Sequence, residues 1–376
     1  MTCYYSSHYT VKVDIFLSKM GGYPNVRTVA RIQLEKGMEL AEDVYDYKNN
    51  LLFPAGTIVD EQCIAKLSRY SVMAVNIKDM TEHATTHYEK VRYSVEFTTF
   101  EKEYFLRLKD YKNLFSKLLN EGRIPSENEL ISLYASVRFF AKEPEKMLDY
   151  LYNMLPGEDD LTYAHCFNSA LIAGVFSEWL KLSEEDTKLL ILCGFYFDIG
   201  KLMLPHELIW KPGRLTPEEF ARMKTHTVLG FEFLLKCKLN DNIVKATLLH
   251  HERFDGTGYP TGAKGTGINR FARYIAIIDA YEAMTSARTY RQSLNPFQVI
   301  ENFEKAGPFQ YDTDVLNAIL FRIASAQVGL TVKLSNDTEG EVIFINQRKL
   351  SRPFIKVNNT PVDLSSMPSL KITSVV

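Results

Sequence analysis

A short run of the chain, from His250 to Pro260, joins metal-ligand side chains to a glycine-punctuated loop. It reads HHERFDGTGYP. Neutral imidazoles, such as those of His250 and His251, are good ligands for zinc, iron, manganese and nickel. The glycines that follow allow the backbone to take φ > 0 or to approach a bound group closely. The run therefore predicts a metal centre beside a rigid loop that could contact a substrate.

Other residues that can bind a metal lie in the same half of the chain. His165 and His226 add two imidazoles. Asp198 follows the apolar run ILCGFYF, and Asp279 lies within ARYIAIIDAYEAMTS, so both carboxylates are predicted to be buried. A buried carboxylate needs a partner or a metal ion. A lone histidine is more often a hydrogen-bonded core residue, but four histidines and two buried aspartates in one region favour a metal.

The composition is that of a globular protein without a strong charge. The chain has 376 residues, of which 46% are hydrophobic and 24% charged, and its net charge is -2. This balance gives no reason to expect binding to DNA or to a membrane surface. Five scattered cysteines without a CxxC pair predict a reducing, cytoplasmic environment. No apolar run approaches the ~20 residues of a membrane helix.

The hydrophobic pattern predicts a mainly helical protein in four segments. Residues 1–80 form a small β-rich module, and residues 81–124 form a helical connector. Residues 125–326 read as an all-helical domain, and residues 327–376 alternate apolar and polar side chains as a small β module does. Helices must therefore position the candidate metal ligands, because all of them fall within the helical domain.

The connector carries one long apolar stripe, spaced by threes and fours and ending at Gly122, which predicts a single long helix. The stripe consists of Phe97, Phe100, Tyr104, Leu108, Tyr111, Phe115 and Leu118. One interpretation is a helix that packs on its neighbours within the chain. The alternative is a homodimer through residues 97–118.

Several short motifs occur together in a fixed order. They are DIGK at 198–201, KPGRLT at 211–216, HTVLG at 226–230, HHERFDGTGYP at 250–260, Asp279, and RTYR at 288–291. Together with His165, these motifs closely resemble the HD-GYP domain family in order and approximate spacing. The family comprises helical metallophosphodiesterases that hydrolyse the bacterial second messenger cyclic di-GMP. The HHE…GYP element alone is highly specific for it.

The resemblance implies a role for each matching metal ligand. The six ligands would be His165, Asp198, His226, His250, His251 and Asp279. Asp198 would bridge two metals, the three histidines that follow it would complete one site, and His165 and Asp279 would contribute to the other. Two metals about 4 Å apart can share a hydroxide nucleophile and neutralise the charge that develops on a phosphate.

The resemblance also implies the residues that bind the nucleotide. Lys201 would contact the scissile phosphate. Tyr259, Arg288 and Arg291 would line the pocket for the cyclic dinucleotide. An arginine can bind a phosphate or a guanine edge through two parallel hydrogen bonds.

Three positions depart from the family's pattern. Phe197 stands where the family has the histidine of its His-Asp pair, and a phenyl ring cannot ligate a metal. Leu161 occupies the place of a glutamate one helical turn before His165, and Asn168 that of a basic residue. The sequence therefore predicts one tightly bound divalent transition metal, iron or manganese, and a second metal that is weak or absent.

Three functional hypotheses remain open. The first is a phosphodiesterase that opens cyclic di-GMP to pGpG or GMP, with activity weakened by Phe197. The second is a catalytically degenerate cyclic di-GMP receptor whose output passes through the flanking β modules or through protein partners. The third, an HD phosphohydrolase for another nucleotide, is disfavoured by the GYP element.

Overall fold

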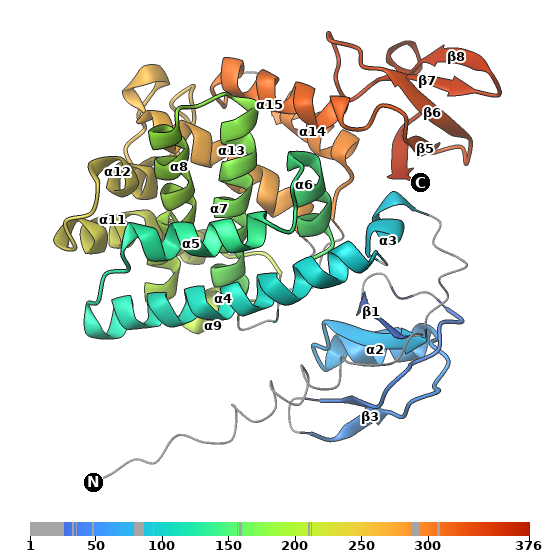
Figure 1. Ribbon diagram of the computed structural model, residues 1–376, viewed down its shortest axis with the longest axis horizontal. Coiled ribbons are helices and arrows are strands. Elements are labelled where there is room, and N and C mark those ends of the chain that lie inside the picture. The colour runs from blue at the N-terminus through green and yellow to red at the C-terminus, as the bar shows by residue number, and fades with distance from the viewer. Residues whose placement is uncertain are drawn as a thin grey trace. The chain divides into compact units, whose positions relative to one another are not determined.

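The chain divides into two compact units, residues 1–83 and residues 84–376. The computed structural model describes residues 26–376 apart from 32, 33, 35, 47, 48, 79–85, 93, 156, 158, 159, 210, 212, 287–292, 307 and 308. The predicted fold class is confirmed, because the described residues are mainly helical and small sheets lie towards both ends of the sequence (Figure 1). The finer division into four segments stays a prediction.

The first unit is a small α/β module. It contains β1 (Val26–Ala30), β2 (Val44–Tyr45), β3 (Leu51–Phe53), α2 (Glu61–Arg69) and β4 (Ala74–Lys78). Strand β1 pairs antiparallel with β4, and β2 pairs antiparallel with β3. Helix α2 begins at Asp60, whose carboxylate accepts a hydrogen bond from the backbone N–H of Cys63, an N-cap that stabilises the first turn. Leu40, Leu67 and Ile77 are among its buried core residues.

The second unit is built from helices around a common apolar core. In chain order its helices are α3 (His87–Arg92), α4 (Val95–Glu121), α5 (Glu127–Arg138), α6 (Pro144–Tyr152), α7 (Leu161–Trp179), α8 (Glu184–Tyr196), η4 (Ile199–Met203), α9 (His206–Ile209), α10 (Pro217–Lys224), α11 (His226–Lys236), α12 (Asp241–Leu249), η5 (Gly265–Gly267), α13 (Arg270–Thr285), α14 (Pro296–Ala306) and α15 (Thr313–Ser325).

Helix α7 is the central helix of this unit. It packs against α4, α5, α6, α8, α13 and α15 (Figure 1). Nearly all of its side chains from Ala164 onward are buried, as expected for a helix that is apolar on every side. Polar residues on such a helix, His165 and Asn168 among them, must therefore find partners inside the protein. Within the described part of the chain, no helix has the length and apolarity needed to cross a membrane.

The predicted connector helix is confirmed as α4, and Gly122 ends it with a left-handed φ of 69°. All seven residues of the predicted stripe are buried and belong to the same core as α7. The stripe is thus covered by helices of its own chain, which favours the packing interpretation. A homodimer through residues 97–118 stays a prediction, and it would have to use the other faces of α4.

A five-stranded antiparallel sheet closes the second unit. Its strands are β5 (Thr331–Leu334), β6 (Glu339–Phe344), β7 (Phe354–Val357), β8 (Thr360–Asp363) and β9 (Ile372–Val375), in the order β8-β7-β6-β5-β9. A short helix, η6 (Leu364–Ser366), follows β8. Val332, Val342 and Ile355 are fully buried in the core that the helices share. The amide of Asn295, beside α14, donates to the carbonyl of Thr373 at 3.0 Å. The sheet therefore belongs to the helical unit.

Candidate metal centre

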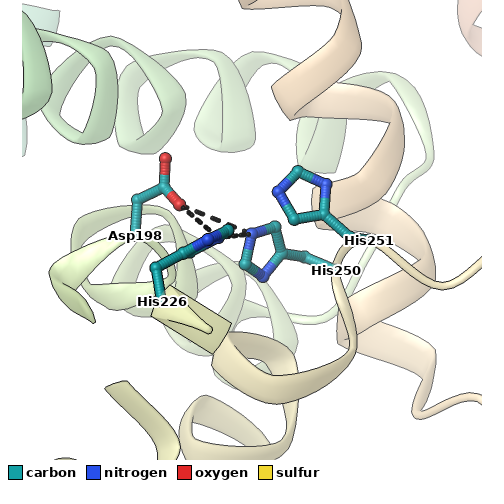
Figure 2. Close-up of side chains that lie close together, drawn as sticks. All are labelled: Asp198, His226, His250 and His251. Atoms are coloured by element: carbon teal, nitrogen blue, oxygen red, sulfur yellow. Dashed lines mark hydrogen bonds and ion pairs between the residues drawn. The ribbon is translucent and has the colours of Figure 1, made fainter. Parts of the chain in front are cut away.

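Four side chains with metal-ligating atoms meet at the ends of helices. Asp198 lies just after α8, His226 opens α11, and His250 and His251 directly follow α12 (Figure 2). One ligand atom from each of the four lies within 4.8 Å of the others. The segments can come this close because Gly200 has no side chain: a Cβ there would lie 1.9 Å from the carbonyl oxygen of His226.

Backbone hydrogen bonds fix which ring nitrogens face the cluster. Nδ1 of His226 lies 2.7 Å from the carbonyl of Met223, and Nδ1 of His250 lies 2.9 Å from that of Thr247. A carbonyl oxygen only accepts, so both Nδ1 atoms donate and both Nε2 atoms present lone pairs. The two Nε2 atoms are 3.4 Å apart. Two lone pairs facing each other at this distance call for a cation between them.

Asp198 supplies the third lone pair of this arrangement. Its Oδ1 atom lies 3.2 Å from Nε2 of His226 and 3.4 Å from Nε2 of His250. The side chain is fully buried, and Oδ1 has no hydrogen-bond donor among the described residues. A buried carboxylate oxygen without a donor is costly. A divalent metal ion bound to all three atoms would remove this cost, so the residues fit a metal.

The charge states of the cluster suit a metal as well. Burial raises the pKa of Asp198, but the Lys201 ammonium and the neighbouring imidazoles outweigh it and hold that pKa well below its ordinary value. Burial lowers the pKa of His226 and of His251. At neutral pH an ionised Asp198 therefore lies beside neutral imidazoles of His226 and His251, which are the protonation states that metal binding requires.

The other oxygen of Asp198 faces a second group of residues. Nε2 of His165, on α7, lies 3.3 Å from Oδ2 of Asp198 and 3.1 Å from Oδ1 of Asp279, on α13. Nδ1 of His165 is hydrogen-bonded to the buried carboxylate of Glu282. Burial lowers the pKa of His165, but these three carboxylates raise it well above its ordinary value. In this half of the site the imidazole is thus the cation among three acids.

Phe197 occupies the position between helix α8 and Asp198. It is fully buried. Its ring contacts the ring of His165, with centroids 5.3 Å apart, and the ring of His250, with centroids 5.0 Å apart. A hydrocarbon ring therefore contacts both halves of the site. It stands at the position where HD-GYP proteins, which this chain resembles, have a histidine.

The loop after His251 is held by an acid whose role was not predicted from the sequence. Glu252 is buried, and its Oε1 atom accepts hydrogen bonds from N–H of Thr261 at 2.7 Å, from the Thr261 hydroxyl at 2.8 Å and from N–H of Gly262 at 3.0 Å. Gly258 lets the loop fold back, because a Cβ there would lie 2.4 Å from Cα of Glu252. The sequence signal that could have indicated this role is an acid directly before a turn rich in backbone donors.

This loop presses Tyr259 against the metal cluster. The Tyr259 ring stacks on His251, with centroids 4.8 Å apart and an interplanar angle of 30°. Burial raises the pKa of Tyr259, and the carboxylates of Asp198 and Asp279 raise it further. The ammonium of Lys224, at the end of α10, lies 5.6 Å from the centre of the same ring. Lys224 is a cation near the site that was not predicted from the sequence.

The remaining predicted nucleotide-binding residues are placed only in part. Lys201, on η4, forms an ion pair with Oδ2 of Asp198 and keeps a partly exposed side chain. Arg288 and Arg291 lie outside the described residues. Of the predicted metal ligands, the structure brings all six together around Asp198, with Glu282 as an additional acid.

Comparisons with known proteins agree with this arrangement. Residues 149–315 match the family model described as "HD domain". A cyclic di-GMP phosphodiesterase of Pseudomonas aeruginosa is 32% identical over 204 residues, which cover 54% of this chain and 49% of that protein. A cyclic di-GMP phosphodiesterase of Thermotoga maritima is 28% identical over 327 residues, covering 82% of this chain and 87% of that protein.

A further relative carries a different nucleotide in its name. The 3'3'-cGAMP-specific phosphodiesterase 1 of Vibrio cholerae is 34% identical over 149 residues, covering 39% of this chain and 34% of that protein. The chain spans about half the length of the Pseudomonas relative. The family match falls on the helical unit that contains the metal cluster, and the predicted resemblance is confirmed. Residues 149–315, which make up less than half of this chain, thus resemble the HD domain family.

Proposed function

We propose that this chain is a metal-dependent phosphodiesterase that opens cyclic di-GMP to pGpG or GMP. The observation that carries the proposal is the convergence of three lone pairs, on Asp198, His226 and His250, in a buried space where Asp198 Oδ1 has no donor among the described residues. The family match and the names of the relatives support the reaction class. The family match and the alignments with these relatives cover only part of the chain, so cyclic di-GMP as the substrate is part of the proposal.

Each residue of the site has a definite task in this proposal. Asp198, His226, His250 and His251 would hold the metal. The ion, when bound, would supply a Lewis acid and lower the pKa of water near a phosphodiester. Lys201, paired with Asp198 and partly exposed, can turn its ammonium towards a phosphate oxygen and offset negative charge there.

The nucleotide would lie over the loop that contains Tyr259. A tyrosine ring fixed by stacking on His251 offers a flat surface on which a nucleobase can stack. Lys224, close to that ring, adds positive charge for a second phosphate. Arg288 and Arg291 are proposed to complete the pocket, as the resemblance to HD-GYP proteins implies.

One tight metal and one weak or absent metal follow from the different chemistry of the two halves. The half around His226 has neutral imidazoles ready to bind. In the other half, His165 holds a raised pKa among three carboxylates, so a metal there must first displace a proton. Phe197 supplies no nitrogen to that half. Iron or manganese is the proposed ion, because mixed imidazole and carboxylate ligands suit both.

A cyclic dinucleotide receptor without turnover is the second candidate. The observation in its favour is that Phe197, in the place of a ligand, contacts both His165 and His250. Lys201 and Tyr259 would still bind nucleotide in such a protein, and protein partners or the sheet β5–β9 would carry the output. The relative named for 3'3'-cGAMP makes that nucleotide the first alternative ligand to compare.

Turnover by the purified full chain separates these candidates. We expect cyclic di-GMP with Mn²⁺ or Fe²⁺ to yield pGpG or GMP, detected by chromatography, and His251→Ala to abolish the product. His87→Ala is the matched control. Nε2 of His87 lies 3.0 Å from Oδ2 of Asp149, and neither residue belongs to the metal cluster. Saturable binding without product would support the receptor. Absence of both binding and product, with 3'3'-cGAMP giving neither as well, would overturn the proposal.

A further inference from the structure

A buried chain of hydrogen bonds leads from helix α4 to His165. The Tyr104 hydroxyl donates to Oδ1 of Asn168 at 2.7 Å. The Asn168 amide nitrogen donates to Oε1 of Glu282 at 3.0 Å. Oε2 of Glu282 accepts from Nδ1 of His165. All four side chains are buried, and they come from three helices, α4, α7 and α13.

The chemistry of these groups allows one arrangement of the chain. An ionised carboxylate only accepts hydrogen bonds, so Asn168 must turn its NH₂ group towards Glu282 and its oxygen towards Tyr104. Tyr104 must then donate. His165 must carry its Nδ1 proton towards Glu282, which leaves Nε2 as the ring nitrogen that faces Asp198 and Asp279. The chain thus fixes both the orientation of the ring and the nitrogen that is presented.

We propose that Tyr104 and Asn168 are positioning residues for His165, acting through Glu282, and that they tie helix α4 to the weaker half of the metal centre. The inference rests on the proposed metal-dependent function. Because α4 is a single helix of 27 residues, a shift of this helix relative to α7 would stretch or break the Tyr104–Asn168 bond. His165 would then lose part of the network that holds its ring in place.

Asn168 has a specific reason to be uncharged in this scheme. HD-GYP proteins, which this chain resembles, have a basic residue at this position. A cation there would compete with His165 for the Glu282 carboxylate. The neutral amide makes a hydrogen bond to Oε1 and leaves Oε2 to the imidazole. Ser286 also donates to Oε1. Asn168 and Ser286 thus donate to one oxygen of Glu282 while His165 donates to the other.

The first test compares two tyrosines of the same helix. Tyr111, also on α4 and buried, donates its hydroxyl to the carbonyl of Phe195, away from Glu282. We expect Tyr104→Phe, and not Tyr111→Phe, to shift the NMR resonance of the hydrogen-bonded Nδ1 proton of His165 in the metal-free full chain. The resonance is assigned by its loss in His165→Gln. Equal spectra for the two Tyr→Phe variants would overturn the proposal.

Mn²⁺ titration of the same proteins gives a second readout. Loss of an outer hydrogen bond to a ligand weakens metal binding by about 10-fold or more. Tyr104 acts on His165 through Asn168 and Glu282, so we expect a smaller loss of affinity, at the weaker Mn²⁺ site, for Tyr104→Phe and none for Tyr111→Phe. If the wild-type chain takes up no Mn²⁺ while Tyr104→Phe still shifts the His165 resonance, the positioning chain stands and the proposed metal-dependent function fails. If Mn²⁺ binds and both variants match wild type in both readouts, the positioning chain fails alone.

A swap of the two central groups provides the rescue experiment. Asn168→Asp alone places two carboxylates against each other, and we expect it to displace the His165 resonance. Asn168→Asp combined with Glu282→Gln restores a donor between the two positions, an acceptor for Tyr104 and an acceptor for His165. The double variant should therefore recover the Nδ1 proton signal that the single variant loses. A double variant as perturbed as Asn168→Asp, with both proteins folded, would contradict the proposed connection.

Discussion

The phenyl ring of Phe197 meets the imidazole of His250 edge to face, with ring centroids 5.0 Å apart and an interplanar angle of 85°. The same ring contacts His165. Since His250 belongs to the cluster around Asp198 Oδ1 and His165 to the group around Oδ2, a single apolar side chain touches both halves of the centre. The difference between the two halves in their metal-ligating groups can therefore be tested by changing Phe197 alone.

Phe197→His is expected to raise both metal content and turnover. The new imidazole would start from the position of a ring that already contacts His165 and His250, so it would need no rearrangement of the backbone. We expect elemental analysis to show a second metal ion per chain. Phe195→His is the control, because it buries an imidazole in α8, where the Phe195 ring packs against Tyr111 and Phe167. Unchanged metal content in Phe197→His would mean that the limitation lies elsewhere, with Leu161 the next position to change.

Removal of the metal is expected to lower the thermal stability of the chain. The lone pairs of His226, His250 and Asp198 converge in a buried space, and a bound ion stabilises the folded state by an amount that rises with the logarithm of its free concentration relative to Kd. At a free concentration 100 times Kd the gain is about 2.7 kcal/mol, or a Tm higher by about 5 °C. Scanning calorimetry with Mn²⁺ and with EDTA measures it. His251→Ala should show no difference between the two conditions, and an equal difference in that variant would contradict the assignment.

The pH dependence of the metal-free protein is expected to have two opposite contributions. Burial lowers the pKa of His226 and of His251. Their contribution to stability is present above the unfolded-state pKa of about 6.5 and is lost as pH falls through the lowered folded-state values. Burial also lowers the pKa of His165, but Glu282 and the other carboxylates outweigh this effect, so that the pKa lies well above its ordinary value. Its contribution is present below about 6.5 and is lost as pH rises through the raised value.

Urea unfolding at a series of pH values separates these contributions. In EDTA, we expect the free energy of unfolding of the wild-type chain to decline on both sides of neutrality. His165→Gln should make the decline on the alkaline side smaller, because buried tyrosines such as Tyr259 also contribute there, and it should keep the one on the acid side. An alkaline decline of the same size in His165→Gln would show that another group is responsible.

The sequence was sufficient for the parts of the site that local pattern encodes. The stripe from Phe97 to Leu118 predicted helix α4, and the resemblance to HD-GYP proteins implied that Asp198 and the later histidines would meet. The sequence was not sufficient to predict the role of Glu282. This residue lies one helical turn after Asp279, and its role depends on its hydrogen bond to His165, which lies on another helix. The role of Asn168 could not be predicted from the sequence for the same reason. Its two partners, Tyr104 and Glu282, lie 64 and 114 residues away in the chain, and no periodicity reveals such contacts.

Glu252 gives a further prediction, because it connects the metal cluster to the loop that holds Tyr259. Its Oε1 atom accepts three hydrogen bonds from Thr261 and Gly262. Glu252→Ala would leave these donors without a buried partner, at a cost of about 1–3 kcal/mol in the free energy of unfolding. We also expect a higher Kd for cyclic di-GMP, since the Tyr259 ring would no longer be fixed against His251.

The matched control for Glu252 is another acid of the same loop. Asp255 is partly exposed, and it accepts hydrogen bonds from the nearby Thr257, through N–H at 2.9 Å and through the hydroxyl at 2.7 Å. Asp255→Ala should therefore leave the Kd for cyclic di-GMP close to that of the wild type. Glu252→Gln, which keeps one acceptor oxygen, should fall between the wild type and Glu252→Ala in titration calorimetry. Equal affinities for Glu252→Ala and Asp255→Ala would show that Glu252 stabilises the fold without positioning Tyr259.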